Sequence, residues 1–292
     1  MSKTLFIGLV THPRSRFLES RGPEGLLAQL ADAMAHHGWL VTTSIHDHDA
    51  LTIGEIDLSS EAIRASIRAE IGTELAWKEF QSQHGVSQRP RFILWLRELY
   101  RSWRFDGFTR ESRKRGQDMI RRLANIECAH MSLLEQAARA DSDWVLIIED
   151  DAYATNVAAL SSALDQHLKA WHDTRQPQYV NISESFPLAA LNLSHPLKSV
   201  EAWDEHGRVY SSQVPFTNTV CAVLYRGSFL KHLHSAMSKI PLEPIIPIDW
   251  KLNRAIMDLA ESGQLGAHDC YVVEPAPIRQ GSMHTSATTI AD

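Results

Sequence analysis

Three consecutive acidic residues, Glu149, Asp150 and Asp151, directly follow the apolar segment 144–148. Adjacent carboxylates repel one another and lose hydration beside a buried strand, so the cluster is costly unless a cation or hydrogen-bond donors compensate it. A divalent ion is the simplest compensation, and oxygen ligands favour Mg²⁺ or Mn²⁺. Such an ion would bridge a diphosphate and stabilise the charge on it as it leaves. The motif predicts a metal site; the alternative is a solvated acidic turn that caps the next helix.

The elements that position this motif follow from the hydrophobic pattern. The unbroken apolar run at 144–148 predicts a strand covered on both faces. In an extended backbone, Glu149 and Asp151 would project to one side and Asp150 to the other. Strands alternate with helices along the chain, which predicts an α/β fold with a mainly parallel sheet and places the acidic motif at a carboxyl edge, where such sheets bind ligands. We expect strands at 4–10, 39–45, 179–183, 218–225 and 271–273, a hairpin at 199–213, and helices at 23–38, 59–83, 113–140, 157–171 and 249–263.

Composition sets the class of protein. The chain has 292 residues, of which 44% are apolar and 22% charged, as expected for a folded globular protein of one large domain or two small ones. It contains neither an apolar run long enough to span a bilayer nor the pattern of a secretory signal, and its three cysteines, Cys128, Cys221 and Cys270, give no disulfide framework. We therefore expect a cytoplasmic protein whose cysteines are small core residues.

Charge is unevenly distributed. Residues 89–122 contain eleven Arg or Lys against four acids, a formal charge of +7, so the rest of the chain carries −13 of the total of −6. Apolar residues Trp95, Leu99 and Trp103 recur at helical spacing in this segment, which predicts an amphipathic basic helix. Such a helix could rest on an anionic membrane surface or receive an anionic acceptor; the alternative is a helix packed on the core with a solvated basic face. General nucleic-acid binding is not expected from so local a patch.

Four segments of the chain form a recognisable series: His130-Met-Ser-Leu-Leu-Glu135, Trp144-Val-Leu-Ile-Ile-Glu-Asp-Asp-Ala152, Cys221-Ala-Val-Leu-Tyr-Arg-Gly-Ser-Phe-Leu230 and Pro247-Ile-Asp-Trp250. In matching order, they resemble glycosyltransferase family 25, which includes lipopolysaccharide glycosyltransferases and procollagen galactosyltransferases. The resemblance covers residues 125–290 and, loosely, 5–16, whereas 36–122 has no counterpart. Residues 84–122 are interpreted as a basic helical insertion in a single catalytic domain, 1–292.

The resemblance implies a GT-A fold, which is a Rossmann-like mixed sheet flanked by helices, together with a nucleotide-sugar donor, a Mn²⁺ or Mg²⁺ ion and an inverting reaction. It implies that Asp151 is the main metal ligand, with Glu149 and Asp150 helping to hold the metal, ribose or sugar. His284, in the C-terminal tail, would be a further metal ligand. The implied donor-binding residues are Thr11, Arg14, Arg16, Asp150 and Gln280.

Asp249 is the candidate catalytic base, because inversion by a single displacement needs a carboxylate to accept the proton of the attacking hydroxyl. It follows Pro244 and Pro247 and begins a predicted helix, where a rigid element would present it to a cleft. The competing interpretation is an ordinary N-cap. Glu184 is the reserve candidate.

The leading hypothesis is a metal-dependent glycosyltransferase that acts on a glycan or a lipid-linked acceptor. We expect it in the cytoplasm, and peripheral attachment to the inner membrane face through residues 89–122 is an open alternative. The same carboxylates would also suit a metal-dependent phosphohydrolase or nucleotidyltransferase. A catalytically degenerate GT-A protein that only binds is the non-enzymatic alternative.

Overall fold

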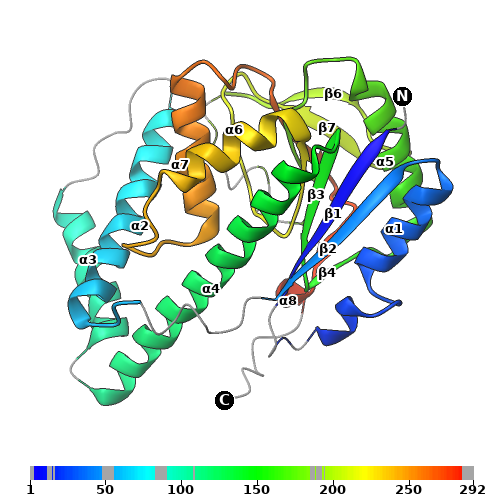
Figure 1. Ribbon diagram of the computed structural model, residues 1–292. Coiled ribbons are helices and arrows are strands. Elements are labelled where there is room, and N and C mark those ends of the chain that lie inside the picture. The colour runs from blue at the N-terminus through cyan, green and yellow to red at the C-terminus, as the bar shows by residue number, and fades with distance from the viewer. Residues whose placement is uncertain are drawn as a thin grey trace.

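The computed structural model describes residues 3–11, 15, 17–47, 56–82, 91–107, 109–184, 188, 193 and 195–284. Eight strands form one sheet in the order β2-β1-β3-β8-β5-β9-β7-β6 (Figure 1). The strands are β1 (Thr4–Thr11), β2 (Leu40–Asp47), β3 (Trp144–Glu149), β5 (Tyr179–Asn181), β6 (Lys198–Ala202), β7 (Arg208–Ser211), β8 (Ala222–Arg226) and β9 (Cys270–Glu274).

The sheet is mixed, which corrects the expectation of a mainly parallel one. Strands β1, β2 and β3 run parallel, but β8 is antiparallel to both of its neighbours, β3 and β5. The predicted hairpin β6–β7 adds two further antiparallel pairings, β6–β7 and β7–β9. A mixed sheet flanked by helices is nevertheless the architecture implied by the GT-A resemblance, and the structure is consistent with it.

Two layers of helices cover the sheet (Figure 1). Helices α1 (Leu26–His36) and α5 (Val157–His172) pack on one face, and α4 (Arg110–Ala140), α6 (Gly227–Ser238) and α7 (Ile248–Glu261) on the other. Strand β3 contributes to the apolar cores on both faces of the sheet. Val145 and Ile147 belong to the core under α4, α6 and α7, and Trp144, Leu146 and Ile148 belong to the core under α1 and α5. Its unbroken apolar sequence is thus explained by burial on both faces.

A separate apolar cluster lies beyond the sheet. Helices α2 (Ser60–Gln81) and α3 (Arg91–Asp106) pack beside the first half of α4, and isoleucines such as Ile63, Ile67 and Ile120 form their shared core. Ser59 caps α2, since its side chain accepts a hydrogen bond of 3.2 Å from the Ala62 N–H. Among the described residues, none of the helices is both long and apolar enough to cross a bilayer.

Short elements that the sequence pattern did not predict surround the end of β3. Strands β4 (Ala152–Tyr153) and β10 (Arg279–Gln280) form a second, two-stranded sheet, and α8 (Gly281–His284) follows directly. A 3-10 helix, η1 (Leu18–Arg21), follows the loop after β1. The antiparallel pairing of β4 with β10 brings the C-terminal segment beside the acidic motif.

Candidate active site

The acidic motif lies where β3 leaves the core. Glu149 is the last residue of β3, and Asp150 and Asp151 form the turn into β4. The alternation expected for an extended chain is found, because Glu149 and Asp151 belong to one group of side chains. Asp150 instead accepts a hydrogen bond of 3.0 Å from the Thr11 hydroxyl at the end of β1. The ends of the parallel strands β1 and β3 therefore meet at the Asp150 carboxylate.

Asp151 is buried and tied to the C-terminal segment. Its backbone carbonyl accepts a 2.7 Å hydrogen bond from the Gly281 N–H, and its Oδ2 accepts one of 3.3 Å from the Ser282 N–H. Burial raises the pKa of the Asp151 carboxyl, and the neighbouring charges of Glu149 and Asp150 raise it further, against the lowering effect of the Ser282 donors. The Asp151 carboxylate therefore lacks full compensation from the protein, as expected at a cation site.

A third potential ligand joins the two carboxylates. One ligand atom each from Glu149, Asp151 and Cys221 lies within 4.8 Å of the others. Cys221 is buried, as predicted for a core residue, and its Sγ lies 3.8 Å from Asp151 Oδ1. Burial, followed by the charges of the carboxylates, raises the pKa of this thiol well above its ordinary value, so Cys221 is held as a neutral thiol. The two carboxylates are the hard oxygen ligands that suit Mg²⁺ or Mn²⁺.

Asp249 is not an N-cap, so that alternative is wrong. Helix α7 begins at Ile248 with Pro247 at the N-cap position, which places Asp249 within the first turn. Its side-chain Oδ1 is shielded from solvent and has no hydrogen-bond partner among the described residues. Burial, followed by the charge of Glu149, raises the pKa of Asp249 to about 7, against lowering effects of His130 and the Val220 N–H. The structure thus brings Asp249 into electrostatic contact with the acidic motif.

Two helices hold this arrangement, through His130, which begins one of the four resembling segments, and through an ion pair that sequence reasoning did not select. His130 on α4 is buried, with its Nε2 3.1 Å from Glu149 Oε1. Three residues earlier, Glu127 forms an ion pair with Lys251 of α7, and both are almost fully buried. Because Lys251 is two residues after Asp249, this pair links α7 to the helix that carries His130. Within the sequence, a Lys and a Glu more than a hundred positions apart give no local signal of such a pairing.

A cavity of about 400 Å³ adjoins the acidic motif. It lies between the segment after β1, the turn after β3 and Gly281, and four carboxylate residues line it: Glu19, Glu24, Asp150 and Asp151. An anionic ligand placed there would be repelled by these charges unless a cation accompanied it. The cavity therefore suits either a cationic group or an anion that binds together with a metal ion.

The remaining predicted residues are placed as follows. Gln280 lies in β10 and pairs with Ala152, one residue after Asp151. His284 ends α8, whose first residues contact Asp151, but its side chain lies outside the described part of the chain. Arg14 and Arg16 also lie outside the described residues. Burial raises the pKa of Glu274 at the end of β9, and the charge of Glu184 raises it further. Glu184, the reserve candidate for the base, is therefore associated with the end of β9.

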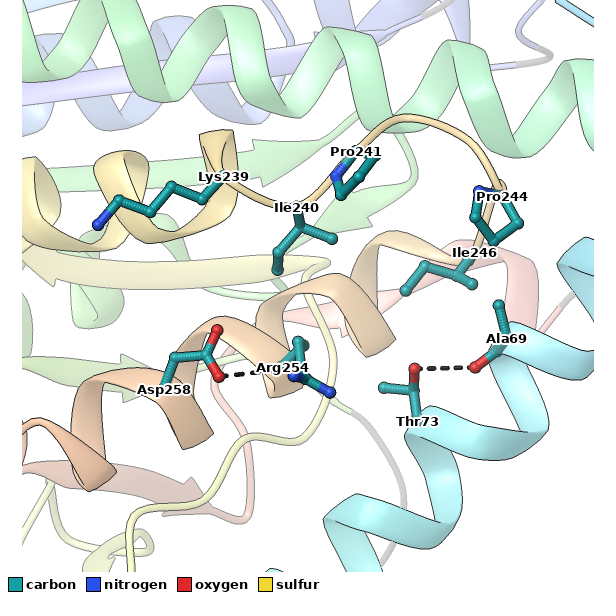
Figure 2. A pocket seen from close by; sticks show the side chains of 9 residues that line it. All are labelled: Ala69, Thr73, Lys239, Ile240, Pro241, Pro244, Ile246, Arg254 and Asp258. Atoms are coloured by element: carbon teal, nitrogen blue, oxygen red, sulfur yellow. Dashed lines mark hydrogen bonds and ion pairs between the residues drawn. The ribbon is translucent and has the colours of Figure 1, made fainter.

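A second cavity, of about 300 Å³, lies between α2, α7 and the loop that joins α6 to α7 (Figure 2). Its two charged residues on α7, Arg254 and Asp258, face each other with a separation of 3.4 Å between Nε and Oδ1. Thr73 donates its hydroxyl hydrogen bond to the Ala69 carbonyl within α2. Neither the acidic motif nor Asp249 lines this cavity, so it lies apart from the candidate active site.

The chain matches no protein-family model and no curated protein. A solved structure that aligns with it is that of a glycosyltransferase involved in the glycosylation of the major capsid of PBCV-1. The alignment covers 98% of this chain and 94% of that chain, with 9% sequence identity and a TM-score of 0.37. A likeness of this size assigns no activity to the chain, so function must be argued from the site itself.

Proposed function

We propose that this protein is a metal-dependent glycosyltransferase that moves a sugar from a nucleotide-sugar donor to a hydroxyl group. The supporting observation is that Asp249, whose shielded Oδ1 has no hydrogen-bond partner among the described residues, lies in electrostatic contact with Glu149 at the end of β3. These acids come from distant parts of the chain and have no structural need of one another. Such a costly convergence is typical of a site built to hold a cation and to move a proton.

Glu149 and Asp151 would hold Mn²⁺ or Mg²⁺, with His284 as a further ligand from the C-terminal segment. The ion, when bound, supplies positive charge to the diphosphate of the donor and to the nucleoside diphosphate that leaves. Its charge would also offset the repulsion between an anionic donor and the acidic residues that line the cavity beside Asp151. Thr11, Arg14, Arg16, Asp150 and Gln280 are proposed to bind the donor.

Asp249 is proposed as the general base. The acceptor oxygen attacks the anomeric carbon, the bond from that carbon to the diphosphate oxygen breaks, and the hydroxyl proton passes to the Asp249 carboxylate. A pKa of about 7 suits this task, because the group is then a stronger base than an ordinary aspartate and is still ionised in a useful fraction at neutral pH. The reaction would invert the anomeric configuration, since it proceeds by one displacement.

The first test is to incubate the protein with a panel of nucleotide sugars and glycan or lipid-linked acceptors in the presence of Mn²⁺. We expect Asp151→Asn to reduce donor turnover by at least about a hundredfold, because a loss of a metal ligand or of charge stabilisation costs roughly 3 kcal/mol or more. Asp249→Asn should abolish transfer while donor binding persists.

Asp258→Asn is the matched control, because Asp258 lies on the same helix as Asp249 but outside the site. Equal turnover by the wild type and Asp151→Asn would contradict the proposal. Release of nucleoside monophosphate from a nucleoside triphosphate, without sugar transfer, would instead identify the phosphohydrolase or nucleotidyltransferase alternative. Intact donor binding without any turnover would identify a degenerate binding protein.

A further inference from the structure

Helix α3 turns its apolar face toward solvent. Five large residues, hereafter the α3 apolar face, are between 42% and 61% exposed: Trp95, Leu96, Leu99, Tyr100 and Trp103. They follow one another at helical spacing, so they form one continuous stripe. The alternative of a helix packed on the core with a solvated basic face is therefore wrong for these five residues, whose apolar side chains face outward.

Ion pairs explain why α3 has this orientation. Arg101 makes a bidentate contact with Glu70 of α2, with distances of 2.9 and 2.7 Å, and Arg97 Nη2 lies 2.6 Å from Glu74 Oε2. In the reverse sense, Glu98 of α3 pairs with Arg68 of α2. Charges of both signs on the inner side of α3 thus meet their opposites on α2. With α3 packed on α2 through these charges, the five side chains of the α3 apolar face stay largely exposed.

Several cations at this end of the molecule are not paired with acids as Arg97 and Arg101 are. Arg104 of α3 and the residues Arg110, Arg113, Lys114 and Arg115 at the start of α4 are exposed. Within the described part of the chain, none of these five forms an ion pair. Glu111 lies among them, and the other acid of this stretch, Asp106, is paired with Arg64 of α2. Both groups lie at the same end of the molecule, away from α1 and α5 (Figure 1). An exposed apolar stripe and excess positive charge therefore lie at the same end of the molecule.

We propose that the α3 apolar face inserts into the surface of an anionic bilayer, with the cations at the start of α4 on the lipid headgroups. Trp and Tyr favour the boundary between headgroups and acyl chains, and cations near the surface are attracted to anionic lipid. A second copy of the chain is a poorer occupant, because a symmetric contact would bring two segments of charge +7 together. This surface lies outside the candidate active site, so the inference goes beyond the proposed function.

The experiment is sedimentation of the full-length protein with neutral phosphatidylcholine vesicles and with vesicles that contain phosphatidylglycerol, at low and high salt. We expect binding to the anionic vesicles that weakens at high salt. The double variant Trp95→Ser, Trp103→Ser should bind at least about tenfold more weakly. The triple variant Arg113→Gln, Lys114→Gln, Arg115→Gln should lose about a hundredfold, since each cation contributes about fivefold.

The controls change equally exposed residues elsewhere. Leu40→Ser removes an apolar side chain with 61% exposure on β2, and Lys198→Gln, Arg208→Gln and Lys239→Gln remove three exposed cations. Neither control should alter vesicle binding. The substituted positions are exposed, so circular dichroism should show that all variants fold. Wild-type binding that equals that of both α3–α4 variants would overturn the proposal, as would a dimer in analytical ultracentrifugation that the tryptophan variant dissociates. Vesicle binding is read without a donor, so its failure is distinct from failure of the proposed function.

Discussion

At the scale of residues, the site concentrates acids that a purely structural role would avoid. The charge of Glu149 raises the pKa of both Asp249 and Asp151 beyond the effect of burial, and His130 and a few backbone donors offset only part of this increase. Groups held in this way lower stability and are kept where function requires them. Removal of one of these acids is therefore expected to stabilise the folded protein while it destroys the proposed activity.

The first prediction is how the free energy of unfolding of the Asp249→Asn variant depends on pH. The pKa of Asp249 is about 7 in the folded state and about 4 when unfolded, so the folded state binds the proton more tightly. Its contribution to stability is full below pH 4 and is lost as the pH rises to 7. In EDTA, the variant should gain free energy of unfolding over the wild type by about 2–3 kcal/mol between pH 5 and pH 8.

Urea unfolding at each pH measures this difference. Asp258→Asn on the same helix serves as the comparison, because that side chain is exposed and pairs only with Arg254 at the surface. Its effect should stay the same at both pH values. If the difference in free energy of unfolding between Asp249→Asn and the wild type did not change with pH, the pKa of Asp249 would not be raised in the folded protein.

At the scale of elements, the sequence predicts what has a local cause. The apolar run of β3, the Ser59 cap of α2 and the β6–β7 hairpin were all predictable. In the turn of that hairpin, the Asp204 carboxylate accepts hydrogen bonds from the N–H groups of His206 and Gly207. Each of these features depends on residues within a few positions of one another.

Features with a distant cause were not predictable. Strands β4 and β10 have two residues each, too few for a periodic pattern, and their pairing depends on where the C-terminal segment lies. Likewise, periodicity identifies α3 as amphipathic but does not reveal which face meets the protein. The packed face is determined by ion pairs with Glu70 and Glu74 on another helix, α2.

Two glycines test the arrangement of the helices outside the sheet. A Cβ at Gly116 of α4 would lie 2.1 Å from the Phe105 carbonyl oxygen at the end of α3, whereas one at Gly72 of α2 would meet nothing within 4 Å. Gly116→Ala should therefore cost about 2 kcal/mol or more of unfolding free energy, because the backbone must shift. Gly72→Ala should add about 0.5–1 kcal/mol, because alanine favours the helix.

Thermal or urea denaturation of both variants gives the answer. The opposite signs matter more than the sizes, since both changes add the same methyl group. If Gly116→Ala stabilised the protein as much as Gly72→Ala does, α3 and α4 could not lie as close as the structure has them.

At the scale of the whole molecule, the mixed sheet carries acidic residues at the carboxyl end of β3. Helix α3, which packs on α2 beyond the sheet, carries a separate, exposed apolar stripe. The two regions have different physical origins. The first is a cluster of carboxylates that lacks compensation, and the second is an apolar surface left open because charges orient its helix. Sugar transfer and membrane attachment are therefore independent proposals, and either can fail without the other.

The most direct test of the central claim is the melting temperature with Mn²⁺ and a panel of nucleoside diphosphates, for the wild type and Asp151→Asn. Ligands that bind only the folded state stabilise it by mass action. The account predicts that Mn²⁺ with at least one nucleoside diphosphate raises the melting temperature of the wild type by about 5 °C at a hundredfold excess over Kd, and that Asp151→Asn shows no such rise. An unchanged wild-type melting temperature across the panel, or an equal rise in the variant, would contradict it.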